Sequence, residues 1–142
     1  MTHKRYNDLA GALPFFTGCV EVSRNFAQVH PKIYHNELAN LAKTYSSLMN
    51  YPKSLEIFLK EIDGIELYGN RELVMSAYVG IIDAALHIPI KFHICASYLE
   101  KCETFGPKHY WPNYPQRSMV LMLKASYLLR TGRMRDALEC SA

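Results

Sequence analysis

Cysteines and histidines are the side chains of this 142-residue chain best suited to metal or redox chemistry. The cysteines are Cys19, Cys95, Cys102 and Cys140. Zinc sites take ligands in close pairs, whereas His93 and Cys95 are two residues apart and would point to different sides of a helix. Cys95 and Cys102 would lie about 10 Å apart along a helix axis, too far for a disulfide. We therefore expect no metal and no disulfide, and instead buried free thiols in a reducing, cytoplasmic compartment.

The sequence contains no recognisable motif for acid–base or nucleophilic catalysis. Gly64, Gly69 and Gly80 are isolated and follow no predicted strand, so they do not form a phosphate-binding loop. There is no nucleophile elbow and no paired-histidine helix. Asp83, an acidic residue within an apolar stretch, could be a perturbed acid, but we expect it to face solvent or to accept a hydrogen bond from a neighbouring helix. The sequence predicts a protein with no catalytic residues and no cofactor.

The composition predicts one folded domain. Hydrophobic residues make up 49% of the chain and charged residues 20%, which excludes a disordered tail. The net charge is +3 with the basic residues scattered, so we expect no nucleic-acid partner. No apolar run is long enough to cross a membrane, and the short apolar part of the N-terminus is broken by Pro14, which argues against a signal peptide.

Apolar periodicity predicts helical hairpins. Residues 35–62 have a helical apolar stripe at Leu38, Leu41, Ala42 and Tyr45, then a break at Asn50–Tyr51–Pro52, then a second stripe at Leu55, Phe58, Leu59 and Ile62. We expect residues 70–104 to form a second helical pair, with a turn at His87–Ile88–Pro89. We expect residues 116–142 to form a third pair. We expect 5–29 to be another pair or one helix kinked at Pro14, followed by a break at His30–Pro31. Repetition of this kind is typical of a helical solenoid.

Residues 35–62 resemble a tetratricopeptide repeat. Its motif positions are matched here by Leu38, Leu41–Ala42, Tyr45, Met49–Asn50–Tyr51, Ser54 and Phe58. Glu61 departs from the pattern, because the family has a small residue there. The last unit matches at Leu121, Ala125, Leu128, Gly132, Met134 and Ala137, with Lys124 in place of the expected leucine. The segment IELYGNRELVMSAYVG is similar to the long-helix repeats in sensor regions of bacterial signalling proteins.

The resemblance implies an all-α, right-handed superhelix of antiparallel hairpins that spans 1–142 as one domain, with the best-matched repeat at 33–63. It also implies a non-catalytic module that binds a protein or peptide, as the sensor or regulatory part of a larger signalling protein. In that family the first helix of each hairpin lines a concave groove. The corresponding groove residues are Asn36, Ala39, Asn40, Lys43, Ser46 and Ser47. The alternative is a structural oligomerisation spacer whose groove is filled by its own helices.

Two further surfaces are expected to contact partners. Residues 106–115 depart from the helical pattern, and their rings are those enriched in interfaces: His109, Tyr110, Trp111 and Tyr114. The alternative there is that Trp111 folds back between two hairpins. The last repeat has no capping helix, so either the chain is a piece of a longer protein or it forms a homodimer through its C-terminal hairpin. The residues expected in that dimer are Leu128, Met134 and Leu138.

Overall fold

The computed structural model describes residues 3–110 and 116–132, and this part of the chain is all-α, with helices and no strand. The helices are α1 (His3–Arg24), α2 (Pro31–Ser47), α3 (Tyr51–Tyr68), α4 (Arg71–Leu86), α5 (Ile94–Tyr110) and α6 (Arg117–Arg130), with a short 3₁₀ helix η1 (Pro89–Lys91) before α5. None of these helices is both long and apolar enough to span a bilayer.

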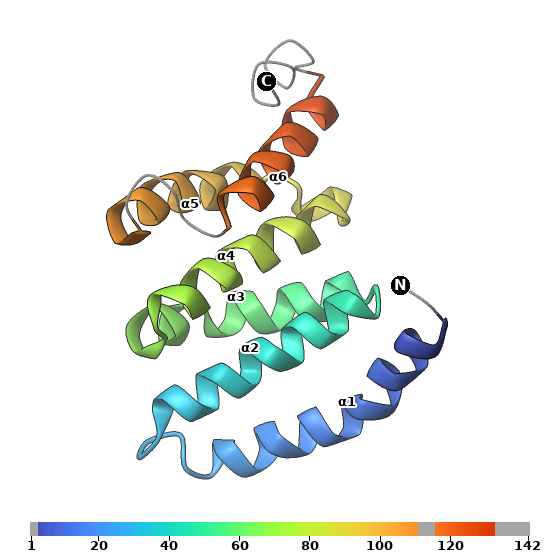
Figure 1. Cartoon of the computed structure of the whole chain (residues 1–142), viewed down its shortest axis with the longest axis vertical. Coiled ribbons are helices and arrows are strands. Elements are labelled where there is room, and N and C mark those ends of the chain that lie inside the picture. Colours follow the sequence, from blue (N-terminus) through green and yellow to red (C-terminus); the bar gives the residue numbers. More distant parts are fainter. Residues whose placement is uncertain (1–2, 111–115, 133–142) are drawn as a thin grey trace.

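The helices form a stack whose spatial order follows the order of the chain (Figure 1). Each helix from α1 to α6 packs against the next one, and α4 also contacts α2 and α6. Helix α1 lies at one end of the stack and α6 at the other (Figure 1). The predicted hairpin over 33–63 corresponds to α2 and α3, and the predicted hairpin over 70–104 corresponds to α4 and α5.

Local signals explain where these helices begin and end. Pro31 and Pro52 lie in the first turns of α2 and α3, where proline has no hydrogen bond to lose. The side chain of Asn50 caps α3 by accepting a hydrogen bond from the Lys53 amide at 3.4 Å, and Asn70 caps α4 in the same way. Helix α4 ends at Leu86, directly before the predicted turn. These helices therefore begin or end at the breaks predicted at His30–Pro31, Asn50–Pro52 and His87–Pro89, whereas α3 continues to Tyr68, beyond the predicted end of the hairpin at residue 63.

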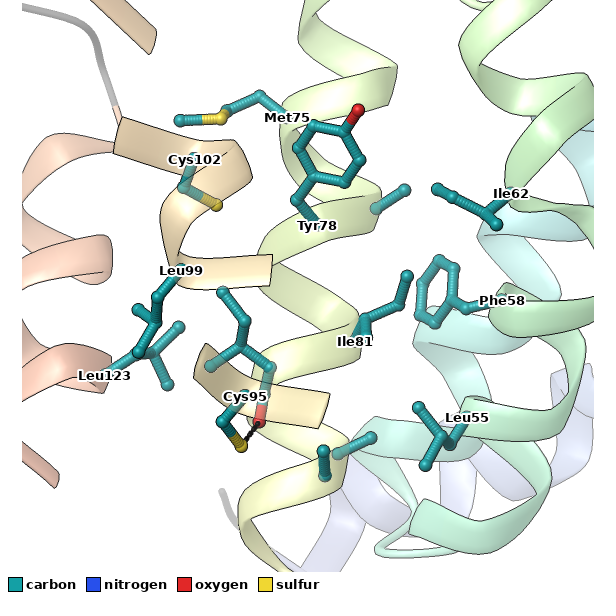
Figure 2. Close-up of a cluster of buried hydrophobic side chains, with 14 of the residues drawn as sticks. Leu55, Phe58, Ile62, Met75, Tyr78, Ile81, Cys95, Leu99, Cys102 and Leu123 are labelled. Atoms are coloured by element: carbon teal, nitrogen blue, oxygen red, sulfur yellow. Dashed lines mark hydrogen bonds between the residues drawn. The ribbon is translucent and has the colours of Figure 1, made fainter. Parts of the chain in front are cut away.

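The main hydrophobic core runs through α2 to α6. Phe58 on α3 and Ile81 on α4 are fully buried and lie next to each other at its centre (Figure 2). A smaller cluster joins α1 to α2 through Val20, Leu38 and Leu41. Tyr45, the motif tyrosine, is half-buried and packs against this smaller cluster rather than against the main core.

Two helices contain a proline in their interior. The N-terminal segment forms one helix, α1, with Pro14 inside it, which is the single-helix alternative rather than the helical pair. Helix α5 continues through Pro107 to Tyr110, so the expectation that residues 106–115 are non-helical is wrong for 106–110. Tertiary contacts hold this last turn: the Phe105 ring packs edge-on against Tyr78 at 5.8 Å between centroids, and the Arg71 guanidinium donates to the carbonyl of His109 at 2.9 Å.

Candidate functional site

A polar stripe on α2 contains four of the six expected groove residues. Asn36, Asn40, Lys43 and Ser47 are spaced four, three and four residues apart, which places them on one face of the helix. Asn36 and Ser47 are exposed, while Asn40 and Lys43 are half-buried. We call this surface the α2 stripe. It is accessible along its length, as a binding surface requires.

The other two expected groove residues lie to one side of this stripe. Ala39 is 0% exposed and belongs to the main core, so its expected role in contacting a partner is wrong. The reason is that α2 packs against both α3 and α4, and residue 39 lies in the core that these helices share. Ser46 is half-buried in the last turn, where its carbonyl accepts from the Met49 amide at 3.0 Å.

Lys43 is the charged member of the α2 stripe. Burial of its ammonium lowers the pKa of Lys43 below the ordinary lysine value, because desolvation disfavours the charged form. An oxygen ligand placed against this ammonium would replace part of the lost solvation. Lys43 is therefore suited to receive a carboxylate or a carbonyl oxygen from a partner.

A hollow of about 560 Å³ adjoins the N-terminal end of the α2 stripe. Asn36 belongs to both the stripe and the hollow. The walls of the hollow come from the first turns of α2, the last turn of α3 and the first turn of α4, and they include three exposed apolar side chains: Ile33 (54% exposed), Leu67 (72%) and Tyr68 (39%). The charged side chains of Lys32 and Glu37 and the amides of Asn36 and Asn70 also line it, so its lining is mixed. We call this feature the apolar hollow after its three exposed apolar side chains. Sequence reasoning missed it, because it depends on bringing the ends of three helices together.

His35 packs against Tyr68, which forms part of the wall of the apolar hollow. Its ring is 8% exposed and stacks on Tyr68, with centroids 5.7 Å apart and planes 9° apart. Burial lowers the pKa of His35, while Glu61, whose Oε2 lies 3.7 Å from His35 Nδ1, acts in the opposite direction. The ring lies against Gly64, where a Cβ would come within 2.2 Å of its Cε1 atom. Glu61, the residue that departs from the family pattern, thus faces a buried histidine.

A second hollow, of about 440 Å³, lies between the end of α3, α4 and α5. The Tyr78 hydroxyl donates to Glu66 Oε2, and Lys101 Nζ lies 3.5 Å from the same oxygen. The Lys101 ammonium also lies 5.6 Å and 5.1 Å from the ring centroids of Tyr78 and Tyr98. Burial, and then the bond to Glu66, raise the pKa of Tyr78 well above its usual range. These polar groups bind to one another, so they are less available to a binding partner than the side chains of the α2 stripe.

The cysteines fit the thiol expectation in part. Cys95 and Cys102 are fully buried, and burial raises the pKa of the Cys95 thiol to about 11 and that of Cys102 to about 12. Both are therefore protonated and unreactive at neutral pH. Cys19 is exposed on α1, contrary to expectation, because α1 is covered on one side only. Within the ranges 3–110 and 116–132, no three His, Cys, Asp or Glu side chains gather as a set of metal ligands.

The remaining predicted contact residues are only partly described. His109 is exposed on the last turn of α5 and packs on Phe105, with ring centroids 4.2 Å apart. Tyr110 is the last residue of α5, while Trp111 and Tyr114 lie outside the described residues. Leu128 is 6% exposed, so it is not available for the expected dimer, and Met134 and Leu138 lie outside the described residues.

Comparison with known proteins adds no relative: no protein-family model, no curated protein and no solved structure matches this chain. Its function is therefore inferred from the geometry of α2, α3 and α4.

Proposed function

We propose that this chain is a non-catalytic module that binds an extended peptide segment of a partner protein along the α2 stripe and in the apolar hollow. The observation that carries the proposal is the continuity of the two features, which share Asn36. Together they offer amide groups, a recess of mixed lining with three exposed apolar side chains, and a half-buried lysine on one surface. Binding sites commonly combine an apolar recess with a few placed polar groups in this way.

The spacing along α2 suits an extended chain. Asn36 and Asn40 are four residues apart, about 6 Å along the helix axis, and two residues of an extended peptide span about 6.6 Å. A carboxamide can donate to a carbonyl and accept from an N–H at the same time, so the two asparagines match alternate residues of a peptide backbone. Lys43 lies about 10 Å from Asn36. We therefore expect the ligand to have an apolar residue, with an acidic residue about three positions away.

The stacking of hairpins supports the further proposal of a tetratricopeptide-like right-handed superhelix. Consecutive helices pack in chain order, and α2, α4 and α6 make direct contact in that sequence. A stack of this kind builds an extended surface from its first helices. Within this proposal the chain acts as the sensor or regulatory part of a larger signalling protein, with the peptide as its signal.

A structural oligomerisation spacer is the second candidate. The apolar outer surface of α6 favours it, since Met119 is 49% exposed, Met122 65% and Leu129 45%. This candidate predicts association without a peptide ligand. The accessible α2 stripe favours the first candidate, because a spacer filled by its own helices would have this surface covered.

Selection from a random peptide library on the immobilised chain tests the proposal. Selected peptides should carry the apolar–acidic pattern, and fluorescence anisotropy should show that Asn40→Ala weakens their binding by about 10-fold, the effect of losing one or two hydrogen bonds. Ser97→Ala, an exposed polar change on α5, is the control and should leave the affinity unchanged. Recovery of no binding peptide, or equal binding by Asn40→Ala, would overturn the proposal.

A further inference from the structure

One face of α1 carries large apolar side chains that the rest of the described chain does not cover. Helix α1 is the outermost helix of the stack (Figure 1), and its inner side packs on α2 through residues that include Val20. Phe15 on the opposite side is 76% exposed and Val22 62%, and Phe26, just after the helix, is 55% exposed. Large apolar side chains aligned in this way indicate an interaction surface.

Glycines alternate with these large side chains. Gly11, Phe15, Gly18 and Val22 are spaced four, three and four residues apart, so they share one face of α1. A Cβ added at Gly11 or at Gly18 would meet no atom within 4 Å. Each glycine therefore leaves a dent in the surface that no described part of the chain fills, and each dent lies about one helical turn from a projecting side chain. We call these four residues the α1 stripe.

The α1 stripe is complementary to itself. When two identical helices pack antiparallel about a twofold axis, residues whose numbers have the same sum face each other. Phe15 then faces Gly18 of the second copy, and Val22 faces Gly11 of the second copy, because both pairs sum to 33. Each large side chain enters a dent, and the twofold axis makes every contact twice.

We infer that two copies of this chain associate through antiparallel packing of their α1 stripes. The alternating large residues and glycines are complementary to the same pattern in a second copy. This favours a second copy of the chain, rather than an unrelated protein, as the binding partner. None of the four residues is charged, so no like charges are brought together. The surface lies on α1 and leaves the α2 stripe free, so the inference stands independently of the proposed peptide site.

The size of the surface sets the expected strength of association. In the register that pairs Phe15 with Gly18, residues 9–24 of the two α1 helices lie opposite each other, a length of about 24 Å. A single helix face of that length buries much less than the roughly 800 Å² per partner of a stable complex. The dimer is therefore expected to be weak, with the monomer predominating except at the highest protein concentrations.

Sedimentation equilibrium of the full chain across micromolar to millimolar concentrations tests the inference. A reducing agent must be present, because Cys19 is exposed and could form an intermolecular disulfide. The average mass should rise from that of the monomer toward twice that value. Phe15→Gly removes the projecting side chain and Gly18→Phe fills the dent, so each change alone should weaken the dimer at least 10-fold.

The two changes made together provide the decisive comparison. Phe15→Gly combined with Gly18→Phe exchanges the positions of knob and dent, so antiparallel packing in the same register is complementary again. The double variant should regain most of the dimer that each single variant loses. Met122→Glu, on the exposed side of α6, is the control and should leave the dissociation constant unchanged.

Three results would overturn the inference. The first is a monomeric mass for the native chain at millimolar concentration. The second is a double variant that associates no better than the two single variants. The third is loss of the dimer in Met122→Glu, which would move the interface to α6. Circular dichroism should show native helicity in every variant, because Phe15 is 76% exposed and a Cβ at Gly18 would have open space around it.

Discussion

Replacement of Gly80 by alanine tests a close approach of two helices in the main core. Gly80 lies on α4 where the Phe58 ring of α3 crosses it, and a Cβ at this position would come within 2.7 Å of Phe58 Cε2 and 2.8 Å of Cζ. Ordinary contact for such atoms begins at 3.4 Å. Phe58 is 0% exposed and lies against Ile81 (Figure 2), so its ring cannot move aside without displacing other core residues.

Two opposing effects set the magnitude. Exchange of glycine for alanine inside a helix stabilises it by about 1 kcal/mol. Overpacking of a tight core costs about 1–3 kcal/mol, and an overlap of about 0.7 Å on a fully buried ring places this site near the upper end. We therefore expect Gly80→Ala to lower the free energy of unfolding by about 2 kcal/mol. Gly18→Ala, the same change where nothing lies within 4 Å, should raise it by about 1 kcal/mol.

Urea unfolding followed by far-UV circular dichroism measures both changes as shifts of the midpoint at constant m-value. Phe58→Leu in the Gly80→Ala background should remove the clash. The double variant should therefore lose less free energy of unfolding than the sum of the losses in the two single variants. A Gly80→Ala protein as stable as the parent, or changes that simply add, would refute the close approach of α3 and α4 at this point.

Two further predictions concern the buried side chain of His35 and the capping of two helices. Burial lowers the pKa of His35, so this residue's contribution to the free energy of unfolding should be fully present above about pH 6.5 and should be lost as the pH falls through the folded-state pKa. Urea titrations at several pH values should show this loss in the parent and not in His35→Gln, and a parent with no such slope would contradict it. Asn70→Ala should cost about 1 kcal/mol, because its side chain accepts from the Leu73 amide at 2.8 Å. Asn50→Ala should cost less, because its capping bond is 3.4 Å long, and an equal loss in the two variants would contradict this ranking.

Helix boundaries were the most predictable part of the fold. Pro31, Pro52 and the turn after Leu86 were correctly placed as breaks, because proline and turn residues act on the backbone beside them. The apolar spacing on α2 and α3 also identified buried residues such as Phe58. These features depend on residues within a turn or two of one another, so no knowledge of the tertiary structure was needed.

The sequence was less informative where distant helices meet. Ala39 and the α2 stripe lie on one helix, but the packing of α2 against its neighbours buries the alanine and leaves the stripe accessible. Pro107 was expected to lie in a loop, and contacts of Phe105 and His109 with α4 hold the helix through it. The apolar hollow needs the ends of three helices, so no sequence window contains it.

The sequence by itself determined that the chain forms helical hairpins and which residues share each helix face, because the period of the apolar residues is a local property. Only the tertiary structure decided which of those faces are covered. Glu61 could be recognised in the sequence as a departure from a repeat pattern. In the folded chain it lies beside His35, whose ring packs against Gly64. The alternation of Gly11, Phe15, Gly18 and Val22 is also present in the sequence, but it becomes an open surface only because Val20, on the other side of α1, packs against α2. Burial depends on contacts between segments far apart in the chain, and such contacts follow from the packing of the whole stack.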